Sequence, residues 1–137
     1  MTGIKSPTMT NLLALTVLDF EKVYYLSGPM TGYENYNYAS FEINATNLRA
    51  LGLKIESPHE NPWPDGHETM DKNKLWRWLM DTAIKQMAAC KGIILMKGWP
   101  QSSGARIELN LAITEGWPVY YYDNYVLTSM NKNVSKV

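Results

Sequence analysis

The sequence predicts a single α/β domain built on a parallel sheet. Its 137 residues suit one domain, and a composition of 45% hydrophobic and 19% charged residues is typical of a folded globular protein. Short β-branched or aromatic runs alternate along the chain with segments of helical spacing. The resulting order is strand, helix, strand, helix, strand, helix, strand. This order favours parallel strands joined by right-handed crossovers.

The first half of the chain supplies two strands, one helix and one long loop. The run Val23–Ser27 is apolar and stops at a Gly-Pro pair, which is typical of the end of a strand. Apolar residues recur at close to helical spacing over Ala39–Leu51, and a glycine follows. Leu53–Ile55 is the second predicted strand. The polar, proline-rich segment Pro58–Met70 is predicted to be a loop, and loops of this length are usually functional or disordered.

The second half adds two helices and two strands. Lys74–Ala89 has an apolar face at helical spacing. Ile93–Met96 is apolar throughout, as in strands buried on both faces of a parallel sheet. A loop over Gly98–Gly104 then leads into the predicted helix Ala105–Thr114, and Val119–Tyr122 forms the last predicted strand.

The two ends of the chain are expected to lie outside this domain, which we place at residues 23–124. Residues 1–22 are predicted to be an N-terminal extension, because the apolar stretch Leu12–Leu18 is shorter than the roughly 20 residues that span a bilayer and lacks the marks of a signal peptide. Residues 125–137 are rich in Asn, Ser and Lys, which predicts a surface tail or a segment lent to a neighbouring subunit.

Charge and cysteine content narrow the classes of function. Thirteen basic and thirteen acidic side chains cancel, which argues against a surface that binds nucleic acid. No membrane partner is expected either. The single cysteine, Cys90, excludes an intrachain disulfide and a multi-cysteine zinc site. A reducing, cytoplasmic location is the simplest interpretation.

The segment from Ser102 to Glu108 follows the most apolar strand and opens a helix. Ser102 or Ser103 can cap that helix, and the free N–H groups of a first turn favour a phosphate. Arg106 could add a bidentate contact to the same anion. Simple capping by the serines, and a solvated position for Arg106, remain the alternatives.

Two carboxylates are candidate catalytic groups. Glu108 lies about one turn into the helix and could be a nucleophile or a general base, or it could simply be an acidic residue favoured near the positive end of the helix. Asp81 precedes Lys85 by four residues, which is typical of an exposed ion pair. Its neighbours Trp78 and Ile84 leave open an inward orientation.

Other possible sites are weaker. The loop of residues 58–70 contains His59 and His67 with Glu60 and Asp65, but they lack a recognised ligand spacing, so no metal is predicted. Neither a Walker-type loop nor a dinucleotide-binding glycine fingerprint occurs, and no cofactor is expected. Tyr33, Tyr36 and Tyr38 with Trp63 could stack a base or form subunit contacts, and the sequence leaves both open.

Three motifs together resemble a known family. They are Tyr25-Leu26-Ser27-Gly28-Pro29-Met30 after the first strand, Asp81 on the second helix, and Ser102-x-Gly104-x-x-x-Glu108 with Ala112 and Gly116. Over about residues 23–123 this combination resembles the nucleoside 2-deoxyribosyltransferase-like superfamily, and within it small phage and bacterial members and the 2′-deoxynucleoside 5′-monophosphate N-glycosidases. The resemblance implies a flavodoxin-like fold, a three-layer sandwich with a parallel sheet of about four to five strands.

The same resemblance implies roles for individual residues. Glu108 matches the nucleophile that forms a glycosyl-enzyme intermediate, Tyr25 matches the tyrosine that positions it, and Asp81 matches the acid that assists the departing base. The residues implied to bind substrate are Ser27, Gly28, Pro29, Met30, Ser102, Ser103, Gly104 and Arg106. Members of the family generally borrow residues from a neighbouring subunit, so a homodimer or larger homo-oligomer is implied.

One position distinguishes the two activities of the family. The transferases carry an acidic residue six positions before the nucleophile, whereas the monophosphate N-glycosidases carry a serine, and here the residue is Ser102. A carboxylate would repel a phosphate that a hydroxyl and free N–H groups would bind. The expected activity is therefore hydrolysis of a 2′-deoxynucleoside 5′-monophosphate. Base exchange on nucleosides and nucleotide binding without turnover are the alternatives.

Overall fold

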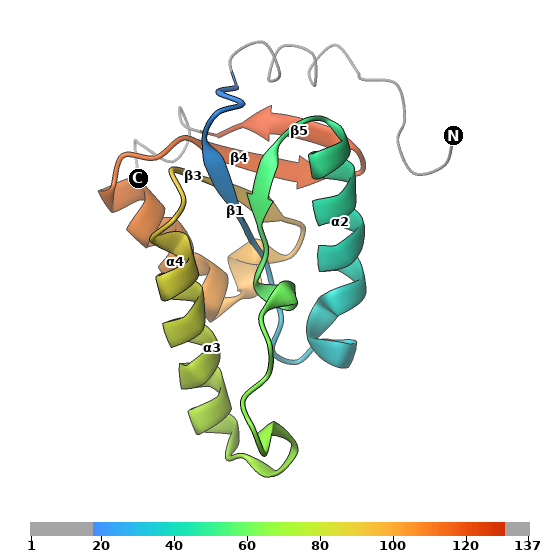
Figure 1. Ribbon diagram of the computed structural model, residues 1–137, viewed down its shortest axis with the longest axis vertical. Coiled ribbons are helices and arrows are strands. Elements are labelled where there is room, and N and C mark those ends of the chain that lie inside the picture. Colours follow the sequence, from blue (N-terminus) through green and yellow to red (C-terminus); the bar gives the residue numbers. More distant parts are fainter. Residues whose placement is uncertain (1–17, 131–137) are drawn as a thin grey trace.

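The computed structural model describes residues 18–130, which form one α/β domain. Its five-stranded sheet has the order β2-β1-β3-β4-β5 (Figure 1). The strands are β1 Val23–Ser27, β2 Lys54–Glu56, β3 Gly92–Met96, β4 Val119–Asp123 and β5 Val126–Ser129. β1 pairs in parallel with both β2 and β3, and β3 pairs in parallel with β4. The predicted flavodoxin-like parallel sheet is thus confirmed.

Three helices cover the two faces of this sheet. They are α2 Tyr38–Ala50, α3 Lys72–Met87 and α4 Ser103–Thr114. α2 lies on one face, and α3 and α4 lie on the other (Figure 1). Four short 3-10 turns complete the connections: η1 Glu34–Asn37, η2 Pro58–Glu60, η3 His67–Thr69 and η4 Trp99–Gln101. All three helices match predicted ones and begin one or two residues earlier than expected.

The core is divided into two layers by the alternation of side chains along the central strands. In β1, Tyr24 and Leu26 pack against α2, whereas Tyr25 belongs to the layer beneath α3 and α4. In β3, Ile94 and Met96 belong to the first layer, and Ile93 and Leu95 belong to the second. Because both faces are covered by helices, β3 is apolar throughout, as the sequence predicted, and the only polar residue of β1 is Ser27 at its end.

The fifth strand was not predicted from the sequence. β5 pairs antiparallel with β4 through a two-residue turn at Asn124 and Tyr125, whose φ angles are 50° and 65°. Positive φ at both central residues is the geometry of the tightest hairpin turns. Leu127 of β5 is fully buried. Residues 126–129 therefore belong to the sheet rather than to the expected tail.

The remaining parts of the expected extension and tail, residues 1–17 and 131–137, lie outside the described residues. None of the helices within residues 18–130 combines the length and the apolar character needed to cross a membrane.

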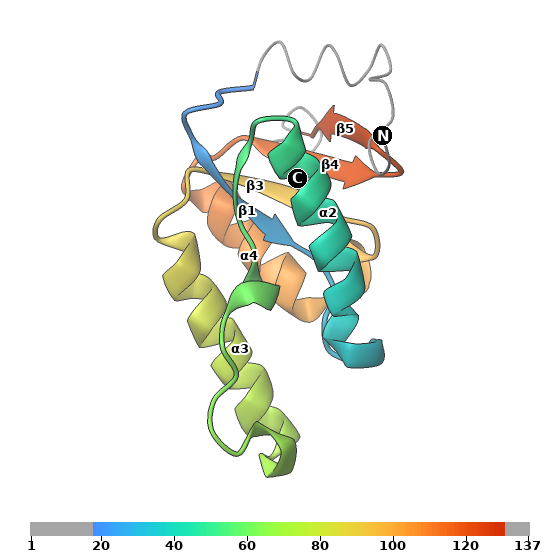
Figure 2. The same cartoon turned by 45° about the vertical axis from the view of Figure 1, so that its right-hand side comes forward.

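The parallel strands end at one edge of the sheet, where the loops after β1, β2 and β3 meet. The N-terminal half of α3 extends past this edge, with the segment of residues 58–70 beside it (Figure 1 and Figure 2). In sheets of this kind, ligands bind outside the carboxyl ends of the strands.

Candidate active site

A cavity of about 240 Å³ opens at the carboxyl edge of the sheet. Its wall combines the ends of β1 and β2, the first turn of α4 and the inner side of α3. The lining residues are Tyr25, Gly28, Met30, Thr31, Tyr38, Pro58, Asn61, Trp76, Trp78, Leu79, Met80, Thr82, Ala83, Gln101, Ser102, Ser103, Gly104, Ala105 and Glu108. Glu108 is the one carboxylate among them.

The carboxylate of Glu108 is held by two hydroxyl groups. The Tyr25 hydroxyl donates to Oε2 at 3.1 Å, and the Ser27 hydroxyl donates to Oε1 at 2.6 Å. Glu108 is only 7% exposed, and both hydroxyl donors are fully buried. The carboxylate is therefore fixed in orientation at the cavity wall.

Burial and hydrogen bonding act in opposite directions on this carboxyl. Burial raises the pKa of Glu108 to about 7, and the hydrogen bonds from Ser27 and Tyr25 limit the rise because they favour the ionised form. Burial, followed by the charge of Glu108, raises the pKa of Tyr25 well above its usual value, so Tyr25 remains a hydrogen-bond donor. Glu108 is thus a carboxyl that ionises near neutral pH, as expected of a catalytic group.

The local sequence explains why these three side chains meet. Tyr25 and Ser27 are two residues apart on β1, so they point to the same face of the sheet. That face is the one that α4 covers, and Glu108 occupies the buried side of α4 together with Ala105 and Ala112. The predicted pairing of Tyr25 with Glu108 is therefore present in the geometry, and Ser27 contacts the same carboxylate.

The first turn of α4 forms another part of the cavity wall. Ser102 is the N-cap, and its hydroxyl oxygen accepts from the backbone N–H of Ala105 at 3.1 Å. Ser102, Ser103 and Gly104 all line the cavity, so capping and cavity lining occur together. A Cβ at Gly104 would lie 3.1 Å from the sulfur of Met80, so the glycine allows α4 to approach α3 closely.

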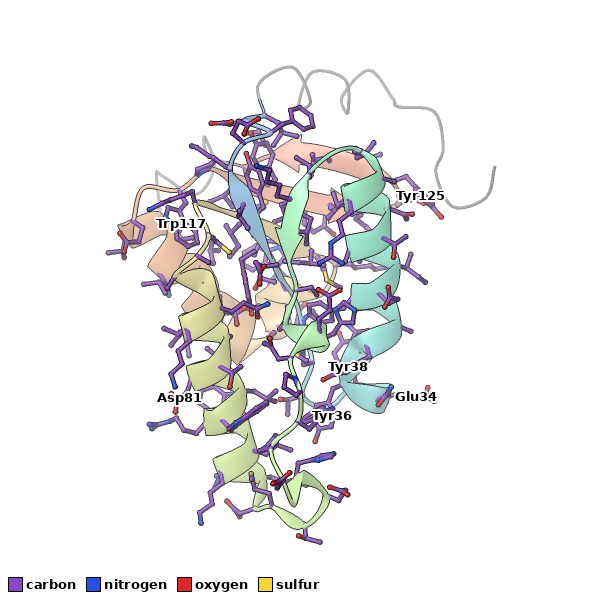
Figure 3. The ribbon with its side chains drawn as sticks, in the orientation of Figure 1. Glu34, Tyr36, Tyr38, Asp81, Trp117 and Tyr125 are labelled. Atoms are coloured by element: carbon purple, nitrogen blue, oxygen red, sulfur yellow. The ribbon has the colours of Figure 1, made fainter. Side chains whose placement is uncertain are left out.

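Some residues with implied roles do not line the cavity. The guanidinium of Arg106 is exposed and donates to the carbonyl of Pro100 at 2.8 Å. Asp81 is also exposed, and Figure 3 shows it on the side of α3 away from Tyr36 and Tyr38. Arg106 and Asp81 are not lining residues, and neither are Ser27 and Pro29. The inward orientation that the sequence left open for Asp81 does not occur in this chain.

Several aromatic side chains pack together beside the cavity. Trp63 stacks on Tyr38 at 5.8 Å and on Trp78 at 6.1 Å between ring centroids, and His67 stacks on Trp63 at 4.7 Å. Tyr36 meets Trp63 edge to face at 5.1 Å, and Figure 3 shows Tyr36 next to Tyr38. Tyr38 and Trp78 line the cavity.

Tyr33 is separate from this group. It is 48% exposed and borders a second hollow near Gly98, between α2 and the ends of β3 and β4.

Comparison with known proteins places the chain in a family. Residues 22–121 match the model of a family described as a domain of unknown function, DUF4406. The chain belongs to the DUF4406 family. No curated protein sequence matches this DUF4406 chain significantly.

Solved structures share the fold of this DUF4406 chain. A 2-deoxyribosyltransferase from the psychrotolerant bacterium Bacillus psychrosaccharolyticus has a TM-score of 0.53 and 17% sequence identity, covering 75% of this chain and 87% of the other. A conserved protein from Enterococcus faecalis V583 has a TM-score of 0.51 and 19% identity, covering 75% of this chain and 64% of the other. The expected likeness to the deoxyribosyltransferase fold is confirmed.

Some cavity residues of the DUF4406 chain were not singled out from the sequence. Asn61, Trp78 and Gln101 are the clearest examples. Asn61 and Gln101 could have been found, because both follow predicted strands whose carboxyl ends share one edge. The position of Trp78 at the cavity could not, because helical spacing alone does not show which way a half-buried tryptophan points.

Proposed function

We propose that this chain cleaves the N-glycosidic bond of a 2′-deoxynucleoside 5′-monophosphate and releases the free base. The observation that carries this proposal is the carboxylate of Glu108, which is buried at the cavity wall and held on both oxygens by Ser27 and Tyr25. A fixed carboxylate that ionises near neutral pH suits attack on an anomeric carbon. The resemblance to deoxyribosyltransferase-like enzymes supports the same chemistry.

In the proposed reaction, ionised Glu108 attacks C1′ of the deoxyribose as the bond from C1′ to the base breaks. The base leaves with the bonding electrons and takes up a proton. Water then attacks C1′ of the glycosyl ester, loses a proton and frees the carboxylate of Glu108. The products are free base and deoxyribose 5-phosphate, with retention at the anomeric carbon.

The proposed phosphate site is the start of α4. Ser102 lies six residues before Glu108, which is about 9 Å along a helix and comparable with the length of a sugar phosphate. The N–H groups of the first turn and the Ser102 hydroxyl offer hydrogen bonds to the anion. Arg106, in contrast, is bonded to Pro100, and binding of the phosphate by Arg106 would require it to move.

The implied role of Asp81 as acid stays a prediction. Its exposed position on α3 provides no contact with the cavity of the same chain. Assembly into a homodimer or larger oligomer, and a cytoplasmic location, likewise remain predictions.

The test is incubation of the purified chain with the four common 2′-deoxynucleoside 5′-monophosphates, followed by chromatography of base and sugar phosphate. We expect free base without any added acceptor base. Glu108→Ala or Glu108→Gln should lower kcat by several orders of magnitude, because the nucleophile is lost. Glu115→Gln, at an exposed glutamate that ends the same helix, is the matched control and should leave turnover unchanged.

Intact-mass measurement of acid-quenched reactions should show the wild-type chain carrying one deoxyribose 5-phosphate. Product that forms only when an acceptor base is added would identify base exchange instead. Tight nucleotide binding by calorimetry with no product from any nucleotide would identify a binding protein.

A further inference from the structure

The proposed positions of sugar and phosphate leave one side of the cavity for the base, and the inference below rests on that proposed function. Glu108 and Ser102 occupy the α4 side. Another wall comes from the segment after β2 and from the aromatic group of residues Tyr38, Trp76 and Trp78. Asn61 supplies a side-chain amide to this wall.

The amide of Asn61 is held in one orientation by Gln86. The side-chain N–H₂ of Gln86 donates both to Glu56 Oε1 at 3.0 Å and to the carbonyl of Ser57 at 3.1 Å. Because both acceptors need an N–H, the Gln86 amide cannot be reversed without loss of these bonds. Its Oε1 therefore faces Asn61, which donates to it from Nδ2 at 2.9 Å.

The hydrogen bonds between these amides determine which atoms of Asn61 are free to bind a ligand. Rotation of the Asn61 amide would place its oxygen against the oxygen of Gln86, which is unfavourable. One N–H and the Oδ1 of Asn61 remain unused by hydrogen bonds within residues 18–130. No buried side-chain polar atom in this part of the chain lacks a partner, so the free Oδ1 is accessible.

The aromatic wall beside Asn61 is also held in place. Tyr38 and Trp78 both stack on Trp63, which fixes two of the aromatic side chains that border the cavity. Aromatic side chains attract the faces of all bases, and such stacking is tolerant of base identity. The hydrogen-bonding edge at Asn61 is thus the part of this wall that can distinguish one base from another.

We propose that Asn61 selects the nucleobase, with its Oδ1 accepting an N–H from the edge of a base that lies against the aromatic wall. The favoured substrates are nucleotides whose base presents an exocyclic amino group at that edge. Gln86 is a positioning residue, because it orients the Asn61 amide without contacting the cavity itself.

The test compares each amino-bearing base with its deamino analogue in matched 2′-deoxynucleoside 5′-monophosphates: adenine with unsubstituted purine, and cytosine with pyrimidin-2-one. Binding is measured by calorimetry and by tryptophan fluorescence on the full chain carrying Glu108→Gln, which prevents turnover. The Glu108→Gln chain should bind the better amino-bearing nucleotide about tenfold more tightly than its analogue, since an acceptor that the bound base covers but leaves without a donor is unfavourable. Adding Asn61→Leu should bring that ratio close to one.

Three comparisons separate this role from a structural one. Asn110→Leu, at an exposed asparagine on α4, is the matched control and should keep the tenfold ratio. Gln86→Leu should reduce the ratio while fluorescence quenching by the base persists. Asn61→Ala, which leaves room for water beside Gln86, replaces Asn61→Leu if the latter does not fold.

The results of this test can be told apart from the results that would refute the proposed hydrolase activity. Either of two results would overturn the role of Asn61 even if turnover is found. One is a binding ratio that stays unchanged in Asn61→Leu and Asn61→Ala. The other is an equal loss of binding affinity for nucleotides and for deoxyribose 5-phosphate. A ratio that depends on Asn61 in a chain that never releases base would support the base site and refute the hydrolase proposal.

Discussion

At the scale of single residues, Glu108 combines burial with ionisation near neutral pH. Its pKa is raised from 4.5 to about 7, so the folded chain keeps a proton at pH values where the unfolded chain has released it. The folded state is therefore destabilised progressively as the pH rises from 4.5 to 7. The shift corresponds to about 3 kcal/mol.

We expect Glu108→Gln to stabilise the chain at pH 8 by about 1–3 kcal/mol, because it removes the buried charge but also one hydrogen bond. Below pH 4.5 the difference should nearly vanish, since the wild-type carboxyl is then protonated in both states. Urea unfolding at pH 4 and pH 8 measures the effect, with Glu115→Gln as control. A difference in stability that is the same at both pH values would show that Glu108 is not buried as a shifted carboxyl.

Ser102 allows a test of the proposed phosphate position. Ser102→Asp places a charge beside the expected anion, and two like charges about 4 Å apart repel by about 4 kcal/mol at an effective dielectric constant of about 20. The ratio of kcat/KM for monophosphate over nucleoside should therefore fall by at least tenfold. Ser102→Asn is the neutral match, because Asn and Asp are similar in size and both cap helices well. An unchanged ratio in Ser102→Asp would exclude the phosphate from this helix start.

At the scale of elements, α3 is important because it carries much of one cavity wall past the edge of the sheet. Its start depends on Asp71, whose side chain accepts from the backbone N–H groups of Asn73 at 3.0 Å and Lys74 at 3.2 Å. A carboxylate at this place satisfies free N–H groups and also complements the helix dipole. The cap thus supports the segment that presents Trp76 and Trp78 to the cavity.

Asp71→Ala should lower the free energy of unfolding by about 1 kcal/mol, the usual cost of losing an N-cap. Asp81→Ala removes an exposed carboxylate from the same helix and should change stability by less than about 0.5 kcal/mol. Thermal and urea unfolding of the two variants make the comparison. Equal stability of Asp71→Ala and the wild type would mean that packing alone defines the start of α3.

At the scale of the whole molecule, β5 extends the sheet and closes one side of the core. Leu127 is fully buried in the layer beneath α2, together with Tyr120 and Tyr122 of β4. The neighbouring Ser129 is exposed. A domain that ended at residue 124 would therefore lose both a strand and a core side chain.

Leu127→Ala should destabilise the chain by about 2–5 kcal/mol, as expected for a truncated core leucine. Ser129→Ala, on the same strand, should change stability by less than about 0.5 kcal/mol. Urea unfolding is again the measurement. A small effect of Leu127→Ala would favour the interpretation of residues 126–129 as a tail.

The local sequence pattern was enough to predict the positions of the first four strands along the chain, their parallel pairing and the three helices. The aromatic and apolar run around Tyr24, Tyr25 and Leu26, and the helical spacing around Glu108, depend on near neighbours in the chain. The sequence by itself also placed Ser27 at a strand end and Ser102 at a helix start, and strand ends share one edge in any parallel sheet. The pairing of Tyr25 with Glu108, in contrast, was implied by the resemblance to the deoxyribosyltransferase-like family.

Only the tertiary structure decided which polar groups meet across elements. Ser27 contacts Glu108 across 81 residues, and Asn61 contacts Gln86 across 25. Neither pair follows a helical or strand period, because the packing of α3 and α4 on the sheet sets these contacts. The outward position of Asp81 and the strand β5 were missed for the same reason: the orientation of a helix about its axis, and the pairing of a short edge strand, depend on surfaces supplied by distant parts of the chain.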